Sequence, residues 1–332
     1  MNNVVLGQSG LLVSELSLGA MTFGRETDEA TSLAMLNRYI DAGGNFIDTA
    51  NVYANGRSEE ILGRALVGRR EEVVLASKVY FRTEPGPYGA DVSRKAIFRA
   101  LTSSLKRLQT DYIDLYQVHC WSNTVPLDEI METLDSLVQR GMVRYLGCSN
   151  YAGWQIAQAS AVAGCGGWSR FVSAQMQYSL VERNIEYEVV PACHACGLSV
   201  MAWGPLGGGF LSGKYRAGER PAEGRLPGQR KEYEDSWERR ATEKNFKILA
   251  LLEAAAKKYG KTVSQTALNW LLTRPGTIPI LGVRTPQQLE DNLGCTGWTL
   301  ADDDLKLLDR ASLPPELYPY RFIDWANHLI TE

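Results

Sequence analysis

The chain has 332 residues, of which 45% are hydrophobic and 22% are charged, as is ordinary for a globular protein. Its 35 Lys and Arg residues against 38 Asp and Glu residues give a net charge of −3, and its pI is near 5.8. We expect no nucleic-acid partner, because this balance lacks the basic surface that a phosphate backbone requires. No apolar run approaches the roughly 18 residues needed to cross a bilayer, and the N-terminus does not resemble a signal peptide. These features predict a cytoplasmic protein without a membrane partner.

The six cysteines do not form the dense pattern of a disulfide-stabilised secreted domain. Cys193 and Cys196 have CxxC spacing, with His194 between them. A structural zinc site needs a second pair of ligands, and no second CxxC follows. A thioredoxin-like site would begin a helix, whereas this pair ends one, just before Gly197. We therefore predict no metal site and interpret these thiols as buried or half-buried.

Short β-rich apolar runs alternate with helical segments throughout the chain. Residues 4–13 (VVLGQSGLLV) predict a β-hairpin, and a first strand at Ser14–Met21 precedes a helix-like stretch from Asp28 to Ala42. The later strands are expected at Phe46–Asp48, Glu71–Lys78, Asp111–His119, Val143–Asn150, Phe171–Tyr178, Gly197–Trp203 and Thr277–Val283. Helical patterns lie between them, and Gly141 is expected to cap one of these helices at its C-terminus.

Regular alternation of strands and helices is typical of α/β proteins with a parallel sheet. Eight such units in a chain of this length favour a closed (β/α)8 TIM barrel over an open doubly wound sheet. The N-terminal β-hairpin is expected to plug the N-terminal mouth, and long loops are expected at the C-terminal mouth. No linker or repeat divides the chain, so we predict a single domain over residues 1–332.

Two segments of this domain are expected to have special roles. The irregular segment 204–240 is far longer than a usual connection, and long loops in compact domains are usually functional. The aromatic-rich C-terminal tail, residues 313–332, is expected either to close over substrate or to pack on the barrel flank.

Catalytic groups of a barrel lie at the C-terminal ends of its strands, where six of the predicted strands here carry a polar or aromatic residue. These residues are Asp48, Lys78, His119, Ser149 with Asn150, Gln175 and Trp203. Asp48, Lys78 and His119 come from three consecutive strands, and Tyr53 follows Asp48 in the loop. A buried ion pair and a hydrogen-bonded core histidine would explain any one of these residues alone, but not the set.

Tyr53, Lys78, Asp48 and His119 together suit acid catalysis. A phenol with a pKa of ~10 is a poor acid at neutral pH until its anion is stabilised. Lys78 can supply that charge, and Asp48 would hold Lys78 in place. His119 could donate a hydrogen bond to a carbonyl oxygen. The set predicts protonation of an oxygen while a hydride arrives at the adjacent carbon.

Six ordered motifs resemble those of the aldo-keto reductases. They are GGNFIDTANVYANGRSEEILGRAL, the isolated Lys78, DYIDLYQVHCW, GMVRYLGCSN, VMAWGPLGGGFLSGKY and IPILGVRTPQQLEDNL. The resemblance extends from about Leu6 to Leu308 and is nearer to the microbial and channel-β-subunit-like branch than to the vertebrate branch. It implies a (β/α)8 barrel that binds a nicotinamide cofactor without a Rossmann domain. It also implies that Asp48, Tyr53, Lys78 and His119 form the family's catalytic tetrad.

The resemblance further implies the cofactor and substrate contacts, with NADPH/NADP⁺ as the cofactor and NADH less favoured. The implied cofactor residues are Met21, Asp48, Ser149, Asn150, Gln175 and Trp203, then Gly204, Pro205, Leu206, Lys214 and Arg225, then Gly282, Arg284, Gln288, Asp291 and Asn292. Among them, Ser149, Asn150 and Gln175 would hold the nicotinamide carboxamide, and Trp203 would stack on the ring. The segment from Gly204 would cover the pyrophosphate, and the segment from Gly282 would hold the 2′-phosphate and adenine.

The implied substrate residues are Tyr53, His119 and Trp121, although Trp121 is equally well explained as an aromatic packed on the barrel rim. Ser122 stands where many family members carry Asp, so the substrate mouth is expected to differ from theirs.

Three other classes fit less well. The run GGFLSGKY, Gly208–Tyr215, nearly matches a P-loop, but Tyr215 stands where a Ser or Thr must bind Mg²⁺. No GxGxxG follows a strand, which argues against a Rossmann dehydrogenase. A metal-dependent barrel hydrolase or lyase would need clustered ligands, and the chain has only 3 His.

The prediction is an NADPH-dependent oxidoreductase that reversibly reduces an aldehyde or ketone. It is expected to use no metal and to act as a monomer or homo-oligomer on a small-molecule carbonyl. The alternative is a cofactor-sensing regulatory subunit of the channel-β-subunit type, with slow turnover.

Overall fold

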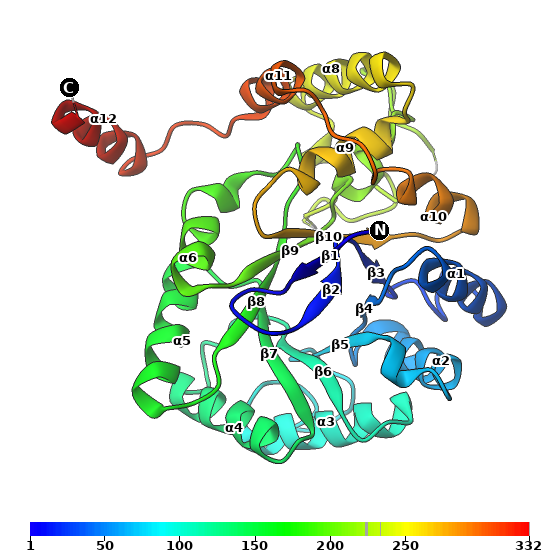
Figure 1. Cartoon of the computed structure of the whole chain (residues 1–332), viewed down its shortest axis with the longest axis vertical. Coiled ribbons are helices and arrows are strands. Elements are labelled where there is room, and N and C mark those ends of the chain that lie inside the picture. The colour runs from blue at the N-terminus through cyan, green and yellow to red at the C-terminus, as the bar shows by residue number, and fades with distance from the viewer. Residues whose placement is uncertain (223–224, 233, 332) are drawn as a thin grey trace.

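The computed structural model describes residues 1–222, 225–232 and 234–331 (Figure 1). Residues 223, 224 and 233 of the predicted cofactor-covering segment and residue 332 of the predicted tail lie outside this description. The described residues form a closed barrel of parallel strands in the order β10-β3-β4-β5-β6-β7-β8-β9, beside a two-stranded sheet, β1-β2. The predicted (β/α)8 barrel with an N-terminal hairpin is thereby confirmed.

The elements alternate as expected; β4 has the predicted bounds, and the ends of the other barrel strands differ from the predicted ones by at most three residues. The strands are β1 (Asn3–Val5), β2 (Leu12–Ser14), β3 (Ser17–Gly19), β4 (Phe46–Asp48), β5 (Val74–Val79), β6 (Ile113–Val118), β7 (Val143–Ser149), β8 (Phe171–Gln177), β9 (Ser199–Trp203) and β10 (Thr277–Gly282). The helices of the barrel are α1 (Glu29–Asp41), α2 (Arg57–Ala65), α3 (Arg94–Leu108), α4 (Leu127–Gln139), α5 (Gly153–Gly166), α6 (Val189–Cys196), α8 (Glu243–Tyr259), α9 (Val263–Leu272), α10 (Pro286–Leu293) and α11 (Asp302–Ser312). Two more helices, α7 (Trp237–Arg240) and α12 (Tyr320–Thr331), belong to the long segment and the tail.

Side-chain caps set several helix starts. The Asp28 carboxylate accepts the N–H of Thr31 at 2.7 Å, so α1 begins at the next residue after Asp28. Thr285 caps α10 in the same way, and Pro286 occupies its first turn, where a missing N–H costs nothing. The helix start predicted at Asp28 is correct.

The hairpin closes the N-terminal end of the barrel. Leu6 and Val13 are fully buried and pack with the barrel-interior residues Phe46 and Leu115. Gly7 has φ +55°, and a Cβ atom there would lie 2.2 Å from the Val172 carbonyl oxygen, so only glycine fits. Figure 1 shows the hairpin lying across the centre of the barrel. The hairpin leaves the opposite, C-terminal mouth as the open end.

The long segment after β9 is more ordered than predicted. It contains the 3₁₀ turn η4 (Gly207–Ser212), whose Phe210 and Leu211 are buried in the core, and the short helix α7. Its far end returns to the barrel, where Asp235 accepts a hydrogen bond from the Gln177 side chain at 3.0 Å. Arg240, almost fully buried, pairs with the same carboxylate.

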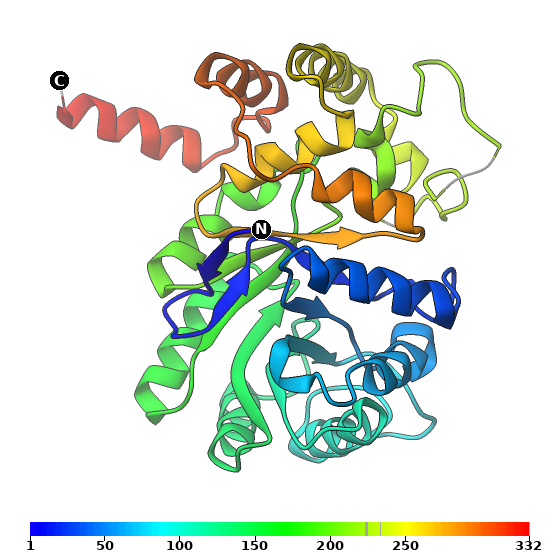
Figure 2. The same cartoon turned by 45° about the vertical axis from the view of Figure 1, so that its right-hand side comes forward.

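The tail ends in a helix that projects from the barrel. In both views α12 lies outside the ring of helices (Figures 1 and 2). The Tyr320 ring at its start stacks on Tyr187 with centroids 5.2 Å apart, while Phe322, Trp325 and Ile330 remain exposed. Neither expected tail position describes this arrangement. None of the helices in the described part of the chain is long and apolar enough to cross a membrane.

Candidate active site

Four side chains meet at the C-terminal mouth, around the Lys78 ammonium. Lys78 donates to Asp48 Oδ2 at 2.5 Å, to the Thr49 carbonyl at 2.9 Å and to Tyr53 Oη at 3.2 Å. Lys78 is fully buried and Asp48 is 3% exposed. The three ammonium protons thus each have an acceptor, as a buried cation requires. The predicted convergence of these side chains is what the structure shows.

A tight turn sets the position of Tyr53. Tyr53 begins the 3₁₀ turn η1 (Tyr53–Gly56), in which Ala54, Asn55 and Gly56 all have positive φ. Left-handed backbone is uncommon for a residue such as Ala54, and such conformations concentrate at functional sites. The turn reverses the chain directly after Tyr53 and holds its hydroxyl against Lys78.

Burial and charge act in opposite directions on the two proton-carrying groups. Burial alone would lower the pKa of Lys78, but Asp48 and Tyr53 raise it above its ordinary value. Burial raises the pKa of Tyr53, and the opposing effect of Lys78 only partly compensates. Lys78 therefore lowers the pKa of Tyr53, as expected, but this effect is too small to make the phenol more acidic than an ordinary tyrosine. Lys78 stays charged and Tyr53 stays protonated at neutral pH.

His119 follows β6 and faces the same mouth. Its ring meets Tyr53 edge-on at 5.9 Å and Phe81 at 4.8 Å between centroids. Burial, and then the charge of Lys78, hold the pKa of His119 well below its usual range, so the imidazole is neutral. Its buried Nδ1 atom has no hydrogen-bond partner among the described residues. A buried nitrogen without a partner is consistent with a site that receives a ligand.

The residues predicted to hold the nicotinamide form one connected group beside the tetrad. Ser149 Oγ donates to the Gln175 carbonyl at 2.8 Å, and Trp203 Nε1 donates to Asn150 Oδ1 at 3.2 Å. The Gln175 side-chain amide donates to Asp48 Oδ1 at 2.8 Å. These contacts join the ends of β7, β8 and β9 to β4. Met21, also in the predicted set, lies half-buried just after β3.

The glycine-rich turn after β9 brings backbone and cations together. Gly207, Gly208 and Gly209 have φ values of +55°, +66° and +91°, which three consecutive residues other than glycine would rarely adopt. The Lys214 ammonium lies 3.5 Å from where a Gly209 Cβ atom would be, so it covers this turn. Burial and the neighbouring Arg284 lower the pKa of Lys214. Two segments distant in sequence thus bring two cations to one place.

The end of β10 and the start of α10 place the other predicted cofactor residues. The Arg284 backbone N–H donates to Gln288 Oε1 at 2.9 Å, just before the helix N-terminus. Asp291 accepts from the Gln265 side chain at 3.2 Å, and Asn292 is buried. Gly282 ends β10. Arg284, with its guanidinium close to Lys214, is the cation that this segment contributes.

The remaining predicted residues lie around the same mouth. Gly204, Pro205 and Leu206 directly follow β9, with Pro205 buried. Arg225 is close enough to Tyr53 to lower the pKa of that phenol slightly, against the larger effect of burial. Trp121 is half-buried and packs edge-on against Tyr151 and Trp154, with centroids 5.1 and 5.5 Å away. These two ring contacts hold the Trp121 side chain in place.

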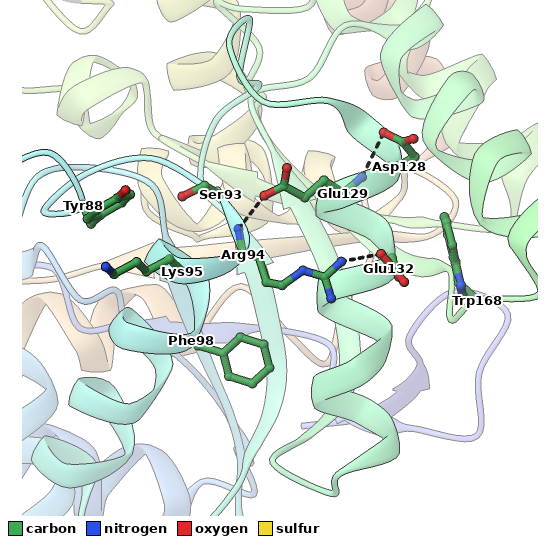
Figure 3. Close-up of a pocket in the computed structure, with 9 residues that line it drawn as sticks. All are labelled: Tyr88, Ser93, Arg94, Lys95, Phe98, Asp128, Glu129, Glu132 and Trp168. Atoms are coloured by element: carbon green, nitrogen blue, oxygen red, sulfur yellow. Dashed lines mark hydrogen bonds and ion pairs between the residues drawn. The ribbon is translucent and has the colours of Figure 1, made fainter.

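Two other features of the molecule lie apart from the tetrad. A cavity of about 710 Å³ opens on the outside of the barrel between α3 and α4 (Figure 3), and none of the predicted site residues line it. Its walls are joined by an ion pair between Arg94 and Glu132. Cys193 is buried and Cys196 is half-buried at the end of α6, as interpreted from the sequence.

The sequence interpretation missed Gln117. This residue is fully buried on β6, and its side-chain amide donates to Asp48 Oδ1 at 3.1 Å. The available signal was its position two residues before His119, which puts both side chains on one face of the strand. A polar residue on the inward face of an otherwise apolar strand indicates a partner inside the barrel.

Comparison with known proteins identifies the family of the chain. A family model described as the aldo/keto reductase family matches residues 15–312. An uncharacterized oxidoreductase, YrpG, from Bacillus subtilis is 39% identical over 93% of this chain and 95% of its own length. A probable voltage-gated potassium channel subunit beta from Oryza sativa subsp. japonica is 35% identical over 87% of this chain and 89% of its own. Norsolorinic acid reductase from Aspergillus flavus is 32% identical over 97% of this chain and 84% of its own. The chain therefore belongs to the aldo/keto reductase family and is an oxidoreductase that acts on carbonyl compounds.

Proposed function

We propose that this protein reduces an aldehyde or ketone to an alcohol with NADPH, and that Tyr53 delivers the proton to the oxygen. We also propose that residues 1–332 act as a single domain, in the cytoplasm, as a monomer or homo-oligomer. The observation that carries the proposal is the position of the Lys78 ammonium, 2.5 Å from Asp48 and 3.2 Å from Tyr53. That geometry suits a proton donor whose anion needs a neighbouring cation.

The residues around the tetrad fit a nicotinamide nucleotide. His119 offers a buried nitrogen without a partner among the described residues, and the Gly207–Gly209 turn offers a backbone that carries no side chains of its own. Lys214 and Arg284 supply positive charge near this turn. Ser149, Asn150, Gln175 and Trp203, with Met21 nearby, would hold the nicotinamide end. When bound, the cofactor supplies the hydride.

The side chains of the tetrad would orient the carbonyl group and transfer the proton. The neutral imidazole of His119 would donate a hydrogen bond to the carbonyl oxygen and orient it toward Tyr53. Tyr53 would transfer its proton to that oxygen, and Lys78 would stabilise the phenolate that remains. Asp48 would keep Lys78 in place throughout. Trp121 would contribute one wall of the substrate mouth.

Arg284 supports the choice of NADPH over NADH. The extra 2′-phosphate carries nearly two negative charges, and Arg284 lies beside the N-terminus of α10, where free N–H groups also favour an anion. Gln288, Asp291 and Asn292 would contact the adenosine. Asp291 tempers the charge of this segment, and NADH therefore remains a weaker second cofactor.

The test is loss of NADPH absorbance with a panel of aldehydes and ketones. Tyr53→Phe keeps the ring and removes the transferable proton, so we expect kcat to fall by ~10²–10⁴ while NADPH still binds. Tyr112→Phe is the matched control, because the Tyr112 hydroxyl donates to Glu71 at the N-terminal end of β6, opposite the mouth that holds the tetrad. Equal turnover in the wild type and Tyr53→Phe would contradict the proposal.

The second candidate is a cofactor-sensing regulatory subunit, favoured by the similarity to the plant protein named as a channel subunit beta. Such a subunit would bind NADPH tightly and turn over slowly. Steady-state turnover of simple aldehydes by the purified chain would favour an enzyme over a regulatory subunit.

A further inference from the structure

Inside the barrel, behind Lys78, several side chains form hydrogen bonds with the Asp48 carboxylate. Asp48 Oδ2 faces Lys78, while Oδ1 accepts two amides, Gln117 Nε2 at 3.1 Å and Gln175 Nε2 at 2.8 Å. Gln117 on β6 is the register partner of Lys78 on β5, so both side chains point into the barrel at the same level. One carboxylate thus receives donors from β5, β6 and β8.

The barrel makes room for the Gln117 side chain. Gly147 on β7 is its register partner on the other side, and a Cβ atom there would lie 3.0 Å from Gln117 Cγ and 2.7 Å from Ser173 Oγ. Gly147 therefore leaves the space through which Gln117 reaches across to β4. A fully buried amide is costly unless it is hydrogen-bonded, and an apolar side chain of similar size would fill the same space.

We propose that Gln117 is a positioning residue that holds Asp48 so that the other carboxylate oxygen meets Lys78. Gln117 would act on Tyr53 through Asp48 and Lys78. The proposal rests on the proposed role of Tyr53 as proton donor. Gln175 donates to the same Asp48 oxygen, Oδ1, at 2.8 Å, but it also belongs to the group that would hold the nicotinamide, whereas Gln117 does not. Gln117 Nε2 donates to Asp48, and Gln117 Oε1 accepts a longer hydrogen bond of 3.4 Å from Gln175 Nε2.

Gln117→Met tests this role, because methionine keeps the length of the side chain and removes the donor. We expect kcat to fall by ~10–100-fold, the loss of one hydrogen bond to a charged group. The KM for the carbonyl and the Kd for NADPH, measured by quenching of tryptophan fluorescence, should stay within about twofold. The solvent deuterium isotope effect on kcat should rise, because a displaced Lys78 slows the proton transfer and not substrate binding. In an Asp48→Asn background, Gln117→Met should cause little further loss.

Ser173→Ala is the matched control, because Ser173 is buried beside Gly147 and its Oγ has no partner in the described part of the chain. It should leave kcat and the isotope effect unchanged. Equal losses in Gln117→Met and Ser173→Ala, or a change in KM alone, would overturn the proposal and leave the role of Tyr53 standing.

If the wild type shows no NADPH-dependent turnover, the proposed function fails instead. Urea unfolding of the Gln117→Met and Asp48→Asn single and double variants then decides: additive effects overturn the proposed contact, and non-additive effects support it. Gln117→Leu repeats the test if the Met variant does not fold.

Discussion

The buried pair of Lys78 and Asp48 allows a quantitative test of the site's architecture. Lys78→Met keeps the aliphatic chain but removes the ammonium that serves three acceptors. Asp48 is 3% exposed. Without Lys78, its negative charge would be stabilised, among the described side chains, only by the amides of Gln117 and Gln175. Breaking a buried ion pair by removing one partner typically destabilises a protein by ~3–5 kcal/mol.

We expect a loss of that size in the free energy of unfolding of Lys78→Met, measured by urea unfolding at pH 7 with tryptophan fluorescence. The double variant Asp48→Asn with Lys78→Met should regain much of it, because it has no uncompensated buried charge. Arg64→Met is the control, because the Arg64–Glu29 pair is exposed, with side chains 45% and 38% accessible, and should leave the unfolding midpoint unchanged. An unchanged midpoint in Lys78→Met, or a double variant less stable than the single one, would refute the reasoning.

Three further predictions follow from the same geometry. Arg284→Ala should erase a preference for NADPH over NADH of ~10–10³-fold, the worth of one or two charge-assisted hydrogen bonds, while NADH kinetics stay the same; wild-type KM values for the two cofactors within a factor of about two would contradict this. Burial raises the pKa of Tyr53 above its ordinary value, and only the protonated phenol donates, so kcat for reduction should not fall below the pH at which an ordinary tyrosine ionises, about 10. A basic limb near pH 8 would exclude Tyr53 as the acid. NADPH should protect the segment 207–240 from proteolysis and slow its hydrogen exchange if the segment covers the cofactor; equal cleavage rates with and without NADPH would rule this out.

The local sequence by itself determined the order of the elements and the position of the tetrad. Alternating apolar runs and helical patterns indicated eight parallel strands, and the C-terminal ends of parallel strands must meet at one mouth. Asp48, Lys78 and His119 therefore converge without any need to know a distance. The helix start at Asp28 was also readable, because capping depends on neighbouring residues only.

Only the tertiary structure decided which side chains meet across the barrel. Gln117 reaches Asp48 from a strand that is not adjacent to β4, and this contact depends on barrel closure and on the space at Gly147. The direction of the Tyr53 pKa also needed the structure, because burial outweighs the charge of Lys78. The aromatic residues of the tail did not indicate what α12 packs against, because an apolar face specifies no particular partner. Local pattern determines an element, whereas contacts between distant elements depend on how the whole chain closes.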